Sequence, residues 1–146
     1  MDYSTRFREL NASIEWRIAL PKSMSDFFEQ RGYVAPFEGD ERRYPRAHMP
    51  TRGVMLFSES LPFLQRDMES AIGVFTANIS RGGMGFVSPI QLFPEERVRI
   101  LLPTCWFDLR IAHCRRIAEN AYRIGCHLLS KNDPSLDALT QPHAIG

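Results

Sequence analysis

The sequence predicts a mainly β protein, a small antiparallel β-barrel that follows an N-terminal helical extension. Short apolar segments separated by glycine, proline and asparagine succeed one another from about residue 52 to residue 129. No helical segment lies between them, which favours an antiparallel sheet over alternating strand–helix units. The chain has 146 residues, the size of one ordinary domain, and a sheet of that size is expected to close on itself as a barrel.

The N-terminal third is predicted to be helical. Apolar residues in segment 4–20 recur at three- and four-residue steps, namely Phe7, Leu10, Ile14 and Ile18. Pro21 ends this helix, and a second short helix is expected from Ser23 or Ser25 to about Arg31, with Gly32 as its C-terminal signal. The apolar anchors of these two elements are Trp16, Phe27 and Phe28. They either pack on the main domain or mediate self-association, and binding of a separate protein partner is a third possibility.

The strands follow a linker at residues 33–40, which contains Pro36 and Gly39. Alternating or continuous apolar residues predict strands at 52–57, 68–78, 84–87, 97–102, 107–117 and 122–129. A glycine-rich turn at 81–83 joins two of them, and Glu119-Asn120 is expected to form a hairpin turn. A short helical turn is expected at 135–140.

Composition excludes several classes of function. The formal net charge of +1 argues against a general nucleic-acid binder, so an anionic ligand must be small and held by local clustering. The N-terminus lacks the apolar core of a signal peptide, and no apolar run approaches the roughly 18 residues that cross a bilayer. The three cysteines form no framework spacing, which fits a reducing compartment. We therefore expect a cytoplasmic protein without membrane insertion.

The first candidate binding element is the basic stretch Glu41-Arg42-Arg43-Tyr44-Pro45-Arg46. Pro45 fixes its own φ and biases Tyr44 away from helical backbone, so the segment is predicted to be extended or turned. Guanidinium groups fork onto phosphate oxygens and stack on bases. By itself, a short basic cluster is more often solvated surface. Pro45 either preorganises the segment or restricts its closure on a ligand, and the sequence leaves both open.

The second candidate element is Asn78-Ile79-Ser80-Arg81-Gly82-Gly83, at the tip of a strand–turn–strand. Asn78 and Ser80 are two residues apart, so they project to the same side if strand geometry persists. Gly83 is expected to allow a positive φ and a close approach of the ligand to the backbone. Such a turn suits a phosphate or the polar edge of a base. The alternative is an ordinary turn in which Asn78 and Ser80 satisfy their own backbone.

Together, the two stretches carry Arg-x-x-x-Arg at Arg42 and Arg46 and Asn-x-Ser-x-x-Gly from Asn78 to Gly83. This pair of motifs, in this order, resembles the PilZ domain family, bacterial receptors for cyclic di-GMP. Segment 96–103 and the hairpin at 111–129 are also similar to strands of that family. The resemblance covers residues 41–130, so 1–40 is assigned to an N-terminal helical extension and linker and 131–146 to a C-terminal tail.

The resemblance implies a six-stranded antiparallel barrel with the arginine segment folded across its mouth. It implies that Arg42 and Arg46 hold guanine faces and phosphates of cyclic di-GMP, with Arg43 as an extra phosphate contact. By the same resemblance, Asn78 and Ser80 would contact a guanine edge or a phosphate, and Gly83 would keep the turn open.

The function expected on this basis is that of a cyclic di-GMP receptor or effector. Nucleotide binding would change its conformation or its contacts with a protein partner, or its self-association through the N-terminal helices. The alternative is a PilZ-like protein–protein adaptor that does not need nucleotide.

Other chemistry has weaker support in the sequence. His113-Cys114 and Cys126-His127 suggest a metal site, but adjacent strand residues point to opposite faces, so Cys114 and Cys126 are predicted to be small core residues. Cys105 has no evident base beside it. No catalytic carboxylate pair is evident among Glu95, Glu96 and Asp108. We expect no enzyme, no metal and no cofactor beyond the ligand.

Overall fold

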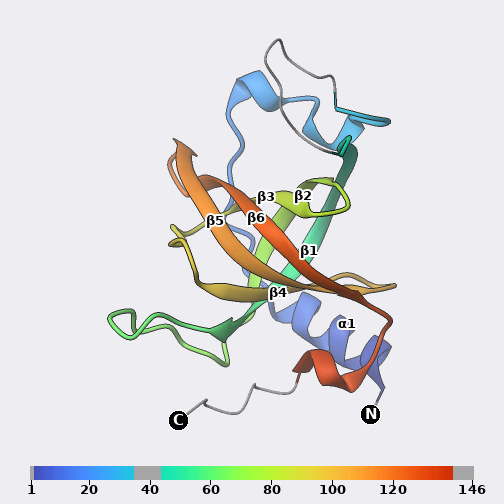
Figure 1. Cartoon of the computed structure of the whole chain (residues 1–146), viewed down its shortest axis with the longest axis vertical. Helices are drawn as coiled ribbons and strands as arrows, with labels where there is room; N and C mark the ends of the chain where they lie inside the picture. Colours follow the sequence, from blue (N-terminus) through green and yellow to red (C-terminus); the bar gives the residue numbers. More distant parts are fainter. Residues whose placement is uncertain (1, 35–43, 140–146) are drawn as a thin grey trace.

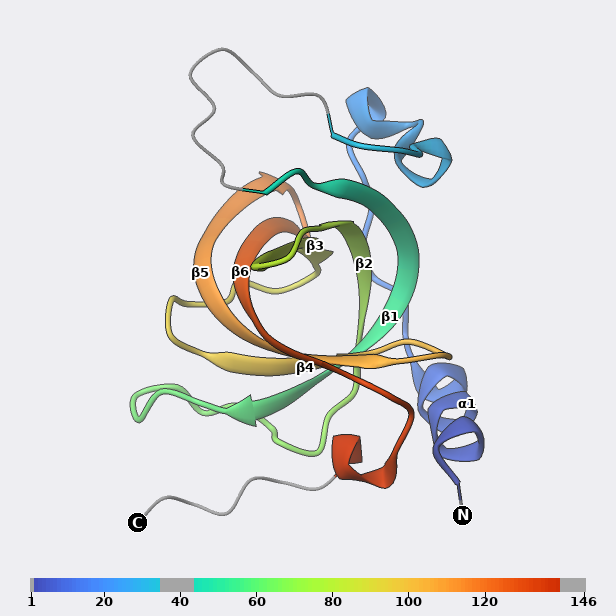
Figure 2. The same cartoon turned by 45° about the vertical axis from the view of Figure 1, so that its right-hand side comes forward.

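Six antiparallel strands form a closed barrel in the computed structural model, which describes residues 2–34 and 44–139. The strands lie in the order β1-β2-β3-β6-β5-β4 around the barrel (Figures 1 and 2). Their bounds are β1 Ala47–Glu59, β2 Ile72–Ile79, β3 Gly83–Ser88, β4 Arg97–Leu101, β5 Trp106–Ala118 and β6 Ala121–Asn132. The predicted six-stranded antiparallel barrel is confirmed. β1 begins five residues before the expected start, at Ala47 rather than at residue 52.

The barrel interior is filled by apolar side chains that alternate along each strand. In β4, Val98 and Ile100 are fully buried, and the arginines on either side of Val98 are not. Large members of this core include Met55, Phe57, Met84, Phe86, Phe107, Leu109, Ile111 and Ile124. Cys126 belongs to the same core and Cys114 packs against it, as predicted. Asn120 takes a φ of 56° in the hairpin turn between β5 and β6, a backbone conformation that asparagine tolerates.

The N-terminal helix α1 spans Tyr3–Ser13, with Asp2 as its cap. It packs on the outside of the barrel, as Figure 2 shows, where Tyr3 and Phe7 contact Val54, Leu101 and Trp106. The Tyr3 hydroxyl donates to the carbonyl of Leu102 at 2.7 Å. No helix in the described part of the chain is long and apolar enough to cross a membrane.

The predicted continuation of this helix to residue 20 is wrong. The chain is extended from Ile14, and the second predicted helix is replaced by two single 3₁₀ turns, η1 Lys22–Met24 and η2 Phe27–Glu29. The apolar residues of this segment are spaced two apart as well as at helical steps. An extended chain lets all four of them, Ile14, Trp16, Ile18 and Leu20, pack against the apolar clusters of the barrel. We call residues 14–31 the N-terminal strap.

The strap is held on β2 by aromatic contacts. Trp16 stacks on Phe75 with ring centroids 6.0 Å apart, and the Arg52 guanidinium lies 5.3 Å from the Trp16 ring centroid. Phe27 is buried at the same place. The anchors predicted for this region therefore contact the barrel of their own chain.

Gly73 is required for this packing. A Cβ at that position would lie 2.5 Å from the Trp16 ring and 2.6 Å from Ile14 Cγ2. We expect Gly73→Ala to displace the strap and lower the free energy of unfolding by about 1–3 kcal/mol in urea denaturation. Gly82→Ala is the control, because a Cβ there meets no atom of the described residues within 4 Å. Equal stability of the two variants would contradict the role given to Gly73.

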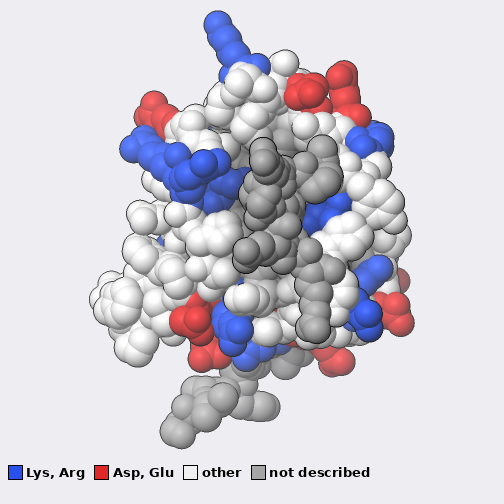
Figure 3. Space-filling view, turned by 45° about the horizontal axis from the view of Figure 1, so that its top comes forward, with Lys and Arg blue, Asp and Glu red and all other residues white. Residues whose placement is uncertain are grey.

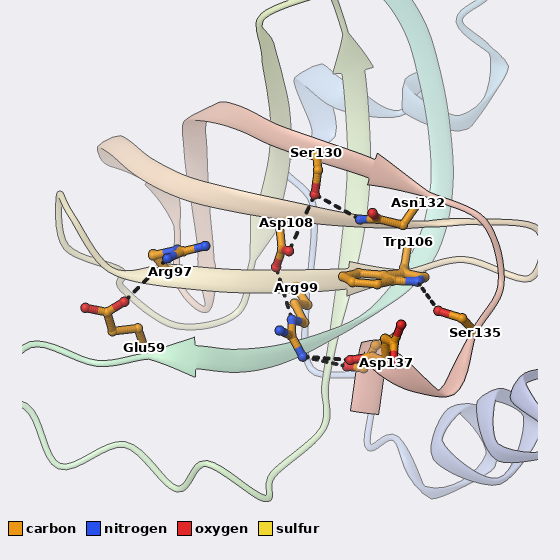
Figure 4. Close-up of polar contacts among 10 residues, drawn as sticks. Glu59, Arg97, Arg99, Trp106, Asp108, Ser130, Asn132, Ser135 and Asp137 are labelled. Carbon is orange, nitrogen blue, oxygen red and sulfur yellow. Dashed lines mark hydrogen bonds and ion pairs between the residues drawn. The ribbon is translucent and has the colours of Figure 1, made fainter. Parts of the chain in front are cut away.

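A polar network fixes the end of the barrel where the chain leaves β6 (Figure 4). Arg99 forms an ion pair with Asp108 at 3.0 Å and donates to the carbonyls of Asp137 and Ala138. The latter two residues belong to the 3₁₀ turn η3, Leu136–Leu139, which confirms the helical turn expected there. Asp108 is thus occupied in a structural contact, consistent with the absence of a catalytic carboxylate pair in the sequence.

Candidate ligand-binding site

The turn of the second sequence motif lies between β2 and β3, beside β6. Ser80 donates its backbone N–H to the carbonyl of Gly83 at 2.8 Å, which closes the turn. Leu128 of β6 donates to the carbonyl of Gly82 at 3.1 Å and ties the turn to the barrel. The turn is therefore fixed at both sides.

The arginine stretch enters the barrel next to this turn. Arg46 directly precedes β1, and its carbonyl accepts a hydrogen bond of 2.7 Å from the N–H of Val34. His48 donates to the carbonyl of Gly32, so the chain before and after the arginine stretch is paired. The linker predicted at 33–40 therefore begins inside a paired segment. The predicted site residues Arg42 and Arg43 lie outside the described residues.

The start of β1 is held by Thr76 of β2. Its buried hydroxyl donates to the carbonyl of Met49 at 2.6 Å, where the pairing of β1 with β2 is irregular between His48 and Thr51. Where strand pairing is irregular, a backbone carbonyl can lack a hydrogen bond from the neighbouring strand, and a threonine hydroxyl can supply that bond instead. The position of Arg46 thus depends on a contact inside the barrel wall.

A pocket of about 450 Å³ lies where the two motifs meet, within the size range of small-molecule sites. Its described lining consists of Tyr44, Arg46, Ser80, Gly82, Gly83, Ala112, His113, Gly125, Cys126 and His127, and includes no acidic residue. Three predicted site residues are thus brought together: Arg46, Ser80 and Gly83. The Arg81 guanidinium lies 5.4 Å from the centroid of the Tyr44 ring, so the turn and the arginine stretch are in direct contact.

Asn78 lies beside this pocket and does not line it. Its side chain is buried over Gly85, and a Cβ on Gly85 would lie 3.1 Å from both Asn78 Oδ1 and an Arg123 guanidinium nitrogen. Among the described residues, Asn78 Oδ1 has no hydrogen-bond partner. A buried amide oxygen without a partner is costly, and an N–H donor on a ligand would satisfy it.

The glycines of the site allow atoms of the neighbouring strand to approach the backbone closely. Gly83 does not have the positive φ that was expected. Among the glycines of the described segments, only Gly32 has a positive φ. Glycine is needed at position 83 because a Cβ would lie 3.1 Å from the carbonyl oxygen of Cys126. On the neighbouring strand, the His113 ring lies over Gly125, in space that a Cβ would occupy. The exposed His113 can therefore form a wall of the pocket.

Comparison with known protein families gives one match. The model of the PilZ domain matches residues 40–141, which includes the arginine stretch, the whole barrel and η3. The chain belongs to the PilZ domain family. This is a family of cyclic di-GMP receptors, whose domains are binding or effector modules rather than enzymes. Searches of curated proteins and of solved structures returned no match.

Sequence reasoning missed several residues in or beside this candidate site. Tyr44, His113, Gly125 and Arg123 were not predicted as binding residues, although Tyr44 stands inside the arginine stretch. His113 and Gly125 are opposite each other in the β5–β6 pairing, next to an irregularity between Ile111 and His113. Such irregularities change which residues face outward, and the sequence alone did not reveal this one.

Electrostatics around the site are dominated by arginine. Burial lowers the pKa of Arg123, and the charges of Arg46 and Arg115 lower it further. Arginine remains charged at any physiological pH, so the lowered pKa indicates a guanidinium in an unfavourable, partly desolvated environment.

The metal alternative finds no geometric support. Among residues 2–34 and 44–139, no group of three His, Cys, Asp or Glu side chains could hold an ion. Cys126 donates its thiol to the carbonyl of Met84 at 3.0 Å, and burial raises its pKa to about 12. Burial also raises the pKa of Cys114.

We expect Cys126 to resist alkylation by iodoacetamide at pH 8 in the folded protein, because the thiolate is the reactive form. Peptide mass spectrometry would locate the label, with protein unfolded in guanidinium as the control in which all three cysteines react. Labelling of Cys126 in the folded protein as fast as in the unfolded control would contradict the burial described for it.

Proposed function

We propose that this PilZ protein is a non-enzymatic receptor for cyclic di-GMP, which binds between the arginine stretch and the β2–β3 turn. The supporting observation is the pocket that joins Arg46 to Ser80 and Gly83, beside which Arg81 contacts Tyr44. Two phosphates and two flat bases are groups that guanidinium and aromatic side chains bind well. The proposed contacts of Arg42 and Arg43 follow from the family motif.

The roles of the individual residues follow from their chemistry. Arg46 would bind phosphate oxygens or stack on a guanine, and the Ser80 hydroxyl would donate to a phosphate or a base edge. Asn78 would accept from an N–H group of guanine through Oδ1, which has no partner among the described residues. Gly83 would leave the backbone of the turn accessible to the ligand.

Signalling would use the connection between the site and the N-terminal strap. The chain that follows the strap is bonded to the site, because the N–H of Val34 donates to the carbonyl of Arg46, so a change at the site would alter the strap and any protein contact it makes. Phe28 and Tyr33 are the exposed aromatics of this region and would belong to such a contact. We place the protein in the cytoplasm, because its three free cysteines fit a reducing compartment.

Calorimetric titration with cyclic di-GMP tests the proposal, with GTP as the control ligand. We expect saturable heat with cyclic di-GMP and none with GTP at the same concentration. Absence of heat with cyclic di-GMP would overturn the proposal.

The alternative is a PilZ adaptor that binds a protein without nucleotide. The exposure of Tyr33, 74%, favours this alternative, because a free aromatic ring beside the site suits a protein contact. Partner binding that survives substitution of both Arg46 and Ser80 would support the adaptor.

A further inference from the structure

The outer face of the β5–β6 hairpin carries two arginines in an arrangement that is unfavourable without an anion. Arg115 of β5 is directly opposite Arg123 of β6. Residues directly opposite in an antiparallel pair project to the same side, and like charges there destabilise the pair. Figure 3 shows a cluster of Lys and Arg side chains at the upper left of the face in view, with further Lys and Arg side chains scattered over the rest of that face.

A third cation completes the group. The charges of Arg46 and Arg115 both act on Arg123, whose guanidinium lies over Gly85 beside the Asn78 carboxamide. Within the described ranges, no carboxylate forms an ion pair with Arg115 or Arg123. By contrast, Arg99 is paired with Asp108 and Arg66 with Glu96.

We propose that Arg115 and Arg123, together with Arg46, form a phosphate subsite that extends the pocket across the outer face of the β5–β6 hairpin. This inference rests on the proposed function for the identity of the ligand. A phosphodiester supplies negative charge for Arg115 and Arg123, which form no ion pair with a carboxylate of the described segments. A base attached to it supplies an N–H donor for Asn78 Oδ1, which is buried beside Arg123 and has no partner in the described part of the chain. A neutral base edge alone would leave the charge uncompensated.

Arg116 provides a matched control. It follows Arg115 on the same strand, so its side chain points to the other face, where it donates to the carbonyl of Ala118. Each of three substitutions removes one positive charge: Arg115→Gln, Arg123→Gln and Arg116→Gln. A difference in ligand binding among these variants therefore reflects the position of the arginine and not the net charge.

The first measurement is the affinity for cyclic di-GMP by calorimetry at several NaCl concentrations. We expect Arg115→Gln and Arg123→Gln each to weaken binding by about tenfold in low salt, and to reduce the slope of log Kd against log salt by about one. Arg116→Gln should stay within about twofold of the wild type. Wild-type affinity and slope in both Arg115→Gln and Arg123→Gln would overturn the subsite and leave the proposed function intact.

The second measurement does not require cyclic di-GMP to be the ligand. We expect inorganic pyrophosphate to raise the thermal unfolding midpoint of the wild type and of Arg116→Gln, with a smaller rise in Arg115→Gln and Arg123→Gln. Without pyrophosphate, Arg115→Gln should unfold at a higher temperature than the wild type, because the like-charge pair is gone. Equal pyrophosphate shifts in all four proteins would overturn the inference. Failure of the wild type to bind cyclic di-GMP would overturn only the proposed function.

Discussion

Arg46→Ala is expected to weaken cyclic di-GMP binding by about 100-fold or more. Arg46 lies directly before β1 and lines the pocket. Its positive charge acts to lower the pKa of both Arg123 and Cys126. Loss of a two-pronged, charge-assisted contact costs about 3 kcal/mol, which is about a factor of 100 in Kd. The hydrogen bond from Val34 uses the Arg46 backbone and is retained in the variant, so the fold should be unaffected.

Calorimetry of Arg46→Ala should be run beside Arg97→Ala. Arg97 lies on β4, outside the pocket, and its exposed ion pair with Glu59 at 3.6 Å contributes little. Both variants lose one positive charge, so only Arg46→Ala should lose affinity strongly. Equal affinity of Arg46→Ala and the wild type would remove Arg46 from the site and favour the adaptor.

Arg66→Ala is expected to give the largest loss of stability, about 3–5 kcal/mol. Its partner Glu96 is fully buried and accepts from Arg66 Nε at 2.9 Å, from Arg66 Nη2 at 3.0 Å and from the N–H of Phe93 at 2.8 Å. Arg66 also packs over the Phe57 ring, 5.1 Å from its centroid. Without Arg66, the Glu96 carboxylate would remain buried with one backbone donor.

Urea denaturation measures this loss, and Arg97→Ala serves again as the reference. We expect Arg97→Ala to cost at most about 1 kcal/mol, because its ion pair is exposed. Adding Glu96→Gln to Arg66→Ala should recover part of the stability, since an uncharged amide is less costly to bury. Similar losses for Arg66→Ala and Arg97→Ala would show that burial does not strengthen the Arg66–Glu96 contact.

The barrel could be predicted from the sequence because strand alternation is local. In β4, residues two apart are buried together, and this pattern does not depend on what lies opposite. The strap could not be predicted in the same way. Ile14 and Ile18 fit a helical period, while Ile14, Trp16 and Ile18 equally fit a period of two. The extended conformation forms because it lets Trp16 pack on the surface of β2, against Gly73 and Phe75.

Three residues of the candidate site could be predicted because they belong to short motifs. Arg46, Ser80 and Gly83 meet in one pocket although the two motifs are far apart in the chain. Arg123 and His113 come from strand pairing, and the pairing of β5 with β6 contains three irregularities that shift its register. A residue that reaches a site only through such a register has no signature in its sequence neighbours.

The hydrogen bond from Val34 to Arg46 has a thermodynamic meaning beyond the positioning of one arginine. It joins Val34 to Arg46, as a cross-link does, so the entropy of bringing these two points of the chain together is already lost in the folded protein. A ligand that binds the arginine stretch does not have to supply that part of the free energy. Residues 2–34 would thus contribute to affinity although none of them lines the pocket. The N-terminal extension would then be part of the receptor's binding energetics as well as its outer layer.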